Sequence, residues 1–297
     1  MTTELARTNG RNVGTYGLIA NDTNDLRLVD MWLATGRRES EHTQSLYLSV
    51  YLAFSASVGV PLQHVTVDTL LTWQRSLKGE PATQRLKIAA VKSLFSFGVK
   101  TGYLALNPSA LLKSPHVTQR ATQHVMSTED VQKLVNACQT ATETALVRCL
   151  YSSGARISEV LALKWLDLTP RDNDAGAHLF IASGKGGKER TVGVNAAAYT
   201  ALLALREGAP DSAFCFATRS GKALDRTAAH RTMKRLLRRA GLPENASCHW
   251  LRHSHATHSL EGGAGLANVM SQLGHASVAT TSIYLHASAY SSDVLAI

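Results

Sequence analysis

The stretch HLFIASGKGGKERTVGV, residues 178–194, decides the fold class of this 297-residue chain. Both of its ends carry branched or aromatic apolar residues, and a turn rich in glycine and lysine separates them. This pattern predicts an antiparallel β-hairpin. Because apolar residues elsewhere recur with helical spacing, we predict a mainly α fold with a small antiparallel β-sheet.

A mostly helical second domain surrounds this hairpin. Residues 127–130, Ser-Thr-Glu-Asp, form a capping box ahead of an apolar run with helical spacing, which predicts a helix start. Further helices are predicted over residues 146–151, 157–163, 196–205, 227–239, 249–260, 266–273 and 278–285. Helices and hairpin together predict a mixed, mainly helical α/β domain.

Residues 21–112 have helical spacing throughout. Apolar clusters at 26–33 and 86–95 lie between short segments that contain Gly or Pro, which predicts four or five short helices. The chain then becomes polar and basic, as in an extended linker. We therefore predict a mobile N-terminal tail at 1–20, an all-helical domain at 21–112, a linker at 113–125 and the second domain at 126–297.

The chain is basic. Its 31 Lys and Arg and 22 Asp and Glu give a net charge of +9 and a pI near 9.5. A positive net charge favours a polyanionic partner, because each neutralised phosphate releases counterions. Many basic proteins bind no polyanion, so motifs have to identify the partner.

The cysteines and the N-terminus indicate where the protein acts. No CxxC pair occurs, and we expect reduced thiols in the core at Cys138, Cys149, Cys215 and Cys248. The first twenty residues do not lead from charge into an apolar run, and no stretch approaches eighteen apolar residues. We therefore expect no secretion and no membrane contact, but a cytoplasmic, nucleoid-associated protein.

His249 and Arg252 stand three residues apart in a predicted helix. That spacing places both on one helix face, where they can reach a single small anion. The alternative is a solvated basic face, since the same helix carries three more histidines. A zinc site is disfavoured, because the run has no HExxH motif and no carboxylate, and Cys248 lacks a matching cysteine pair.

An ordered set of residues suits the transfer of a DNA phosphodiester onto a tyrosine: Arg156, Lys185, His249, Arg252, His275 and Tyr284. Phosphoryl transfer needs cations for the equatorial oxygens, a nucleophile in line and an acid for the leaving oxygen. Each residue also has an ordinary alternative, such as packing for Tyr284 or a solvated turn for Lys185. That turn is not a P-loop, because Glu189 stands where Ser or Thr would bind magnesium.

Together these motifs resemble the tyrosine recombinase (phage integrase) family throughout the second domain, including the bacterial chromosome-dimer-resolving and mobile-element integrases. The matching segments are 150–159 for the first arginine box, 183–190 for the β-hairpin lysine box, 249–258 for the HxxR box, 272–275 for the second histidine and 277–286 for the tyrosine box. The resemblance implies an all-helical core-binding domain followed by a catalytic domain.

The resemblance also implies the chemistry of the reacting groups. Tyr284 would attack the scissile phosphorus, form a 3′-phosphotyrosyl link and release a 5′-hydroxyl. His249 would take the tyrosine proton, and Lys185 would protonate the departing 5′ oxygen. One phosphodiester is exchanged for an ester of similar energy, so no ATP, metal or other cofactor is implied.

In this resemblance three further residues would hold the phosphate, and Glu159 would support the site. Arg156 and Arg252 would bind the non-bridging oxygens, because a guanidinium is a permanently charged planar fork. Glu159 would support the first arginine, and His275 would donate a hydrogen bond to the phosphate. An ordinary ion pair between Arg156 and Glu159 at a helix end is the alternative.

Basic residues of two predicted helices are candidates for DNA contacts. In the run 82–110, which resembles the DNA-facing helix of the family's first domain, they are Arg85, Lys87 and Lys92. In the helix at 227–239 they are Arg231, Lys234, Arg235 and Arg238. Such contacts would position a duplex without specifying its sequence. The alternative is a hydrated basic face on an ordinary amphipathic helix.

The predicted function is site-specific recombination of double-stranded DNA. The family acts as a tetramer on two paired sites, and residues 287–297 are the candidate contact with a neighbouring subunit. Tyr290 is a rival nucleophile that falls outside the tyrosine box. A type IB topoisomerase-like enzyme and a catalytically silent DNA-binding module are the alternatives, and the complete set of catalytic residues argues against the second.

Overall fold

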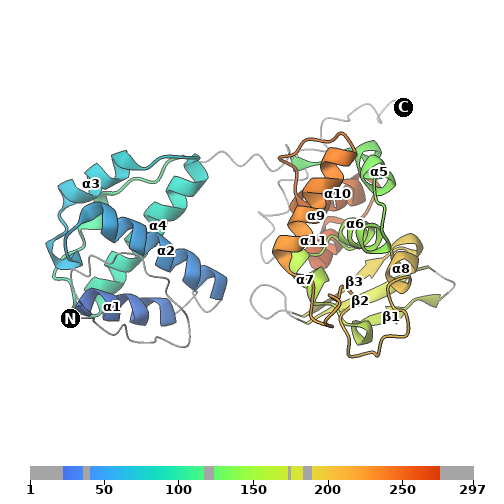
Figure 1. Ribbon diagram of the computed structural model, residues 1–297. Helices are drawn as coiled ribbons and strands as arrows, with labels where there is room; N and C mark the ends of the chain where they lie inside the picture. Colours follow the sequence, from blue (N-terminus) through green and yellow to red (C-terminus); the bar gives the residue numbers. More distant parts are fainter. Residues whose placement is uncertain (1–22, 36–40, 117–123, 173–174, 183–188, 275–297) are drawn as a thin grey trace, which may run out of the picture. The chain divides into compact units, whose positions relative to one another are not determined.

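The computed structural model describes residues 23–35, 41–116, 124–172, 175–182 and 189–274. The chain divides into two compact units, Met1–Thr118 and Gln119–Ile297 (Figure 1). The division falls inside the segment predicted as a linker, residues 113–125. The predicted tail at 1–20 lies outside the described residues.

In the described part of the first unit, every regular element is a helix or a 3-10 turn. Its elements are α1 (Thr23–Ala34), α2 (Glu41–Val58), the 3-10 turn η2 (Leu62–His64), α3 (Val67–Ser76), α4 (Pro81–Lys100) and the 3-10 turn η3 (Pro108–Leu111). Phe54 of α2 is at the centre of the core, with its ring edge-on to Trp73 and Phe95. The predicted all-helical character is confirmed.

Two polar and backbone features fix the chain around α4. Asp25 is buried, and its carboxylate accepts hydrogen bonds from the Tyr103 hydroxyl at 2.6 Å and from the Leu62 amide at 2.9 Å. Gly98 is buried in α4, where a Cβ atom would lie 2.8 Å from Leu104 Cδ1. Glycine at this position therefore allows the segment after α4 to fold back against the helix.

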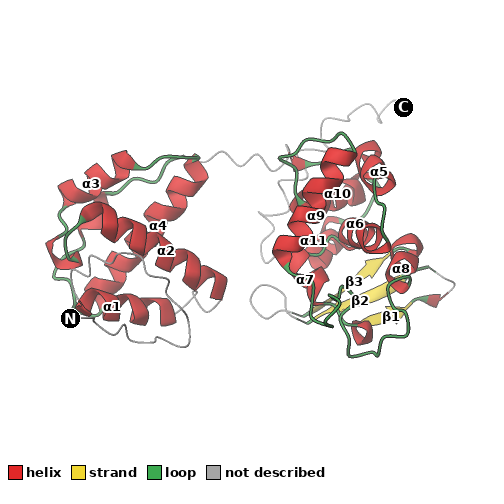
Figure 2. Ribbon diagram, in the orientation of Figure 1, coloured by secondary structure: helices red, strands yellow, loops and turns green. Residues whose placement is uncertain are grey.

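The second unit joins helices to a small sheet. Its helices are α5 (Thr128–Asn136), α6 (Ala141–Ser153), α7 (Ile157–Ala162), α8 (Ala196–Leu203), α9 (Arg226–Arg239), α10 (Cys248–Glu261) and α11 (Leu266–Leu273), with the 3-10 turn η5 (Trp165–Asp167). Figure 2 shows the strands at one end of this unit. The helix start predicted from 127–130 is confirmed, since the Ser127 hydroxyl accepts the Asp130 amide at 3.1 Å.

The sheet has three antiparallel strands in the order β1 (Leu168–Pro170), β2 (Ala177–Ile181) and β3 (Arg190–Val194). The β2–β3 hairpin is the predicted one, with Leu179 opposite Val192. Residues of β2 alternate between buried and exposed, as expected when one face covers a core. Strand β1 was not predicted, because it has only three residues and ends in proline.

Three of the four cysteines lie in the hydrophobic core of the second unit. Cys149, Cys215 and Cys248 are buried, and all four cysteines are free. Burial raises the pKa of the Cys149 thiol to about 12 and that of Cys248 to about 11, so both are protonated at neutral pH. Among the described helices, none is both long and apolar enough to cross a bilayer.

Candidate active site

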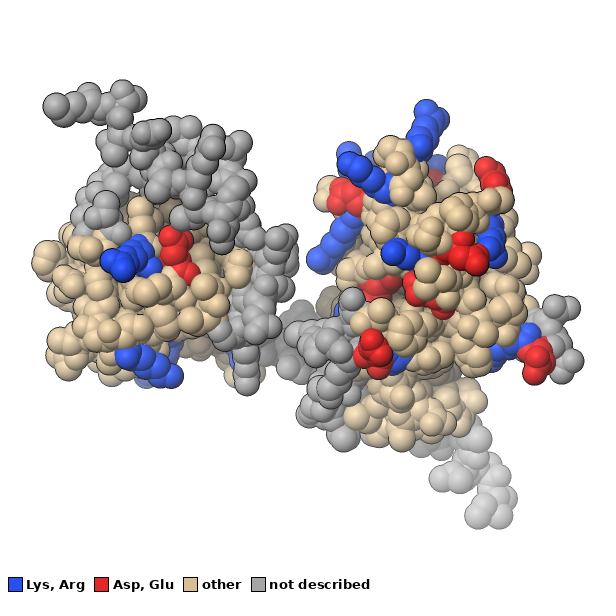
Figure 3. Space-filling view, turned by 90° about the horizontal axis from the view of Figure 1, so that it is seen from below, with Lys and Arg blue, Asp and Glu red and all other residues tan. Residues whose placement is uncertain are grey.

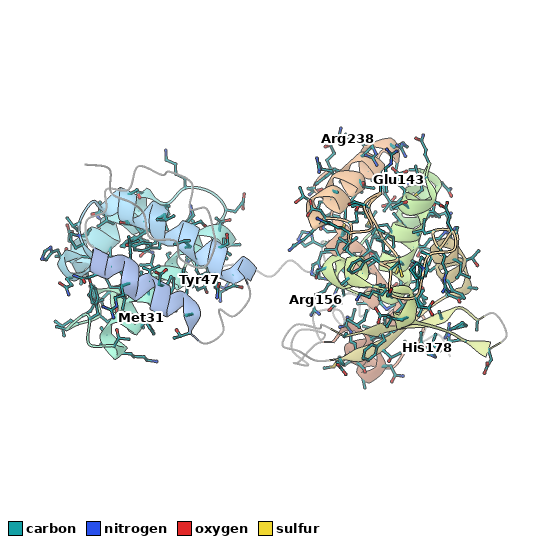
Figure 4. All side chains as sticks on the ribbon, turned by 60° about the horizontal axis from the view of Figure 1, so that its bottom comes forward. Met31, Tyr47, Glu143, Arg156, His178 and Arg238 are labelled. Carbon is teal, nitrogen blue, oxygen red and sulfur yellow. The ribbon has the colours of Figure 1, made fainter. Side chains whose placement is uncertain are left out.

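The turn between α6 and α7 positions Arg156. Gly154 ends α6 in the left-handed conformation, with φ of 60°. A Cβ atom at Gly154 would lie 2.4 Å from His255 Cδ2, so the close approach of α10 also requires glycine. Arg156 then caps α7 with its side chain 27% exposed, and Figure 4 labels it at the edge of the unit. The guanidinium is therefore anchored but accessible.

Glu159 orients this arginine from one turn further along α7. Its carboxylate accepts the Arg156 backbone amide at 2.8 Å and Arg156 Nη1 at 2.7 Å. Burial raises the pKa of the Glu159 carboxyl, but hydrogen bonds from Arg190 and Arg156 outweigh it and lower the pKa to about 2. Glu159 is therefore ionised at neutral pH.

Arg190 is a residue of the site to which the sequence analysis assigned no role. It begins β3, and its Nη2 and Nη1 donate to the two Glu159 oxygens at 2.6 and 3.1 Å. Its Nε donates to the Gln272 carbonyl at 2.8 Å. With 9% of its side chain exposed, Arg190 holds the carboxylate from inside the unit. Its place at the end of the lysine box was the available signal.

Arg252 is held by backbone at the ends of two helices. It is only 2% exposed, and Nη1 donates to the Gly154 carbonyl at 2.7 Å while Nη2 donates to the Leu273 carbonyl at 2.6 Å. Those carbonyls lie at the C-termini of α6 and α11, where helix dipoles favour a cation. A solvated basic face, the alternative considered for this helix, therefore does not describe Arg252.

His249 lies in the first turn of α10. Its ring packs edge-on against His253 with centroids 4.4 Å apart. Burial lowers the pKa of His249 below its usual range, and the charges of Arg252, Arg156 and His124 lower it further. Both arginines thus lie near enough to act on His249, and its imidazole is neutral and able to accept a proton at neutral pH.

Three of the predicted catalytic residues lie in one region of the unit: His249 and Arg252 are three residues apart on α10, and Arg252 Nη1 donates to the Gly154 carbonyl, two residues before Arg156. Lys185, His275 and Tyr284 lie outside the described residues, as do the rival Tyr290 and the tail at 287–297. In the described ranges, no group of three or more His, Cys, Asp or Glu side chains is arranged to hold a metal ion. Two guanidiniums and a neutral imidazole form a site suited to a phosphate.

The basic face of α9 is largely engaged within the unit. Arg235 Nη2 donates to the buried Glu143 of α6 at 2.8 Å, and Arg238 pairs with Glu244 at 3.4 Å. Lys234 donates to the carbonyls of Glu244 and Ala246. On the face shown in Figure 3, basic side chains of this unit lie beside acidic ones. A DNA contact by these three residues would have to share or replace those partners.

Arg231 differs from its neighbours on α9. It is exposed, and no hydrogen bond or ion pair joins it to another side chain in the described part of the chain. In the first unit, Arg85 is exposed and Lys87 half-buried on α4, whereas Lys92 Nζ donates to the Leu112 carbonyl at 2.9 Å. Among the predicted DNA-contacting cations in the described residues, Arg231 and Arg85 are therefore exposed and pair with no other side chain.

Comparison with known proteins gives consistent matches. The model of the phage integrase family matches residues 124–290. Tyrosine recombinase XerC of Xanthomonas campestris pv. campestris (strain B100) is 32% identical over 263 residues, covering 84% of this chain and 80% of that protein. Tyrosine recombinase XerC of Pelobacter propionicus is 33% identical over 282 residues, covering 89% and 90%.

Solved structures share the fold. The pre-cleavage complex of the XerH site-specific recombinase with difH matches with a TM-score of 0.66 and 23% identity, covering 89% of this chain and 85% of that one. A lambda integrase dimer bound to a COC′ core site matches with a TM-score of 0.72 and 17% identity, covering 88% and 94%. The mainly helical architecture with a small sheet is the one these proteins have.

Proposed function

This chain belongs to the phage integrase family, the tyrosine recombinases, and on that premise we propose that it cleaves and rejoins double-stranded DNA at specific sites through a 3′-phosphotyrosyl intermediate. It is an enzyme of the tyrosine-type site-specific recombinase class. A relaxing enzyme of the type IB topoisomerase kind and a silent DNA-binding module are not favoured by these relatives.

One observation carries the assignment of the site. Arg252 Nη1 donates to the Gly154 carbonyl, two residues before Arg156, and His249 precedes Arg252 by three residues on α10, so two permanent cations and an imidazole share one location. Arg156 is oriented by Glu159, and Arg252 by two helix-end carbonyls. A phosphodiester that reaches this location meets donors already fixed in place, which favours the charge that develops in the transition state.

The proposed reaction begins with Tyr284. Its oxygen attacks the scissile phosphorus and His249 takes its proton, so that the phosphorus becomes linked to tyrosine and its bond to the 5′ oxygen breaks. Lys185 gives a proton to that leaving oxygen, producing a free 5′-hydroxyl. Rejoining runs the same step backwards from a 5′-hydroxyl of the same or another strand.

The phosphate itself is held by the remaining residues. Arg156 and Arg252 donate to its non-bridging oxygens and His275 adds a hydrogen bond. The Gly154 and Leu273 carbonyls accept hydrogen bonds from Nη1 and Nη2 of Arg252 and so fix the orientation of its guanidinium. The residues perform this chemistry with no metal, ATP or other cofactor in the proposed scheme.

We further propose that the enzyme acts as a tetramer on paired DNA sites in the cytoplasm, on nucleoid DNA or on a mobile element. Support comes from lambda integrase, solved as a dimer on a core site and as a tetramer bound to a Holliday junction. Residues 287–297 are our candidate for the contact between subunits. Arg231 and Arg85 are the favoured phosphate contacts outside the active site.

A suicide substrate tests the proposed function. Duplexes bound by the protein are first selected from a random pool. A nick is then placed beside the cleavage position, so that the short fragment that carries the new 5′-hydroxyl diffuses away and cannot be rejoined. The wild-type chain should accumulate a covalent 3′-linked protein–DNA species on a denaturing gel. Tyr284→Phe should abolish the species and keep duplex binding, because only the nucleophilic oxygen is removed.

Tyr290→Phe is the matched control and should form the covalent species normally. Adduct formation by Tyr284→Phe would show that the nucleophile is wrong. A plasmid with two sites separates the remaining alternative: exchanged products are expected from a recombinase, and relaxation without exchange would indicate a topoisomerase.

A further inference from the structure

His255 is a polar residue buried at the meeting point of three helices. It lies on α10 and is only 9% exposed. Its Nε2 lies 3.3 Å from Gln272 Oε1 of α11, and because an amide oxygen only accepts, the ring donates this hydrogen bond. A buried polar ring is costly unless it is hydrogen-bonded, so this bond helps to decide how α11 packs on α10.

Gln272 connects the His255 ring to Arg190, the first residue of β3. Its side chain reaches His255, and its amide nitrogen lies beside Gly193 of β3. Its backbone carbonyl accepts Arg190 Nε at 2.8 Å, and Arg190 holds the Glu159 carboxylate that orients Arg156. A continuous hydrogen-bond path thus runs from His255 to the first catalytic arginine.

The last residue of α11, Leu273, binds the second catalytic arginine, Arg252. The Leu273 carbonyl accepts Arg252 Nη2 at 2.6 Å, immediately after the Gln272 carbonyl that accepts Arg190. Two consecutive carbonyls at the end of one helix therefore hold two arginines. A small shift of α11 against α10 would move both acceptors together, because they belong to the same helical turn.

We propose that His255 and Gln272 are a positioning pair for the recombinase reaction: their hydrogen bond fixes α11 on α10 and so keeps the guanidiniums of Arg252 and, through Arg190 and Glu159, of Arg156 aligned with the phosphate. This inference rests on the proposed function. Neither residue touches the DNA in this scheme. Their effect is on the alignment of residues that do.

Single substitutions and their combination should behave differently. His255→Phe leaves the side-chain oxygen of Gln272, Oε1, without its hydrogen-bond donor. Gln272→Leu leaves Nε2 of the buried His255 ring without its acceptor. Loss of one partner of a buried hydrogen bond is costly, whereas replacing both by apolar groups is nearly neutral. At saturating suicide duplex, each single variant should form the covalent species about tenfold more slowly, while the double variant recovers to within about threefold of wild type.

Two comparisons show that the effect is one of position. The dissociation constant for duplex should stay within about twofold in all variants, since no proposed DNA contact is removed. His255→Gln keeps a donor that reaches Gln272 and should retain most of the cleavage rate. Tyr151→Phe removes a different bond between α6 and α10, from the Tyr151 hydroxyl to His258 Nδ1 at 2.8 Å, and should cleave normally.

The outcomes separate this inference from the proposed function. If the wild-type chain forms no adduct, the proposed function fails. If it does form one and His255→Phe is as fast as wild type, or the double variant is no better than the slower single variant, the positioning pair is wrong. Thermal unfolding of all four proteins without DNA gives the same double-mutant cycle independently of cleavage, and additive effects there would also overturn the pairing.

Discussion

At the scale of single residues, the site depends on one buried carboxylate. Glu159 is 3% exposed at its side chain and accepts bonds from two arginines, one facing outward and one inward. Arg190 is the inward partner, and without Glu159 its charge would be left in a nearly closed environment. The carboxylate therefore links the stability of the unit to the orientation of Arg156.

Replacing this carboxylate by an amide of the same shape tests that link. Glu159→Gln should lower the free energy of unfolding of the second unit by about 3 kcal/mol, because Arg190 loses its buried counter-charge. The loss should appear as reduced protection of α6 and α7 amides in hydrogen exchange, together with slower formation of the covalent species. Exposed Glu129 provides the control, and Glu129→Gln should change neither. Unchanged protection in Glu159→Gln would contradict the account.

At the scale of elements, the ends of helices assemble the site. Arg156 follows the end of α6, His249 lies at the start of α10, and the end of α11 supplies acceptors for Arg190 and Arg252. The contact between Gly154 and His255 sets how closely α6 approaches α10. Packing at these ends, more than the length of any helix, determines the geometry of the arginines.

Gly154→Ala tests this close approach. The new methyl group would meet His255 at 2.4 Å and the residue would keep a φ of 60°, so we expect a loss of about 3 kcal/mol in the stability of the second unit. Gly241→Ala is the matched control, with φ of 68° and no atom within 4 Å of the added group. It should cost only about 1 kcal/mol of backbone strain. Equal losses in chemical denaturation would show that the contact with His255 is unimportant.

Much of this arrangement could be predicted from local sequence. The change of period at 178–194 predicted the hairpin, and the spacing of apolar residues predicted α10 within one residue at either end. The ion pair between Glu159 and Arg190 could not be predicted, because it joins residues 31 positions apart. The role of His255 could not be predicted for the same reason. In the sequence it is one of several histidines of one helix, and it becomes buried through contacts with the end of α6 and with α11.

At the scale of the whole molecule, a net charge of +9 is unevenly available to DNA. On α9, Arg235 and Arg239 both bind Glu143, which is 4% exposed at its side chain, so these cations stabilise the second unit. Arg231 has no such partner among the described residues. Net charge therefore overstates the number of cations that can release counterions on binding.

Salt dependence distinguishes these two kinds of arginine. Arg231→Ala should reduce the slope of log K for duplex binding against log salt concentration by about 1 and leave unfolding unchanged, as expected for one lost phosphate contact. Arg235→Ala should mainly lower protection of α6 amides, because it removes a partner of Glu143. If Arg231→Ala leaves the slope unchanged in a salt titration, α9 does not contact the phosphate backbone of DNA through this residue.

The way Arg252 is held has a consequence for how this protein can change over evolutionary time. Its acceptors are main-chain oxygens, and every residue type supplies one, so replacement of the Leu273 side chain leaves the acceptor in place. Insertions and deletions are another matter, because adding or removing one residue in α11 would rotate a different carbonyl toward the guanidinium. This hydrogen bond therefore constrains the length of the helix and leaves the choice of side chain at position 273 to core packing.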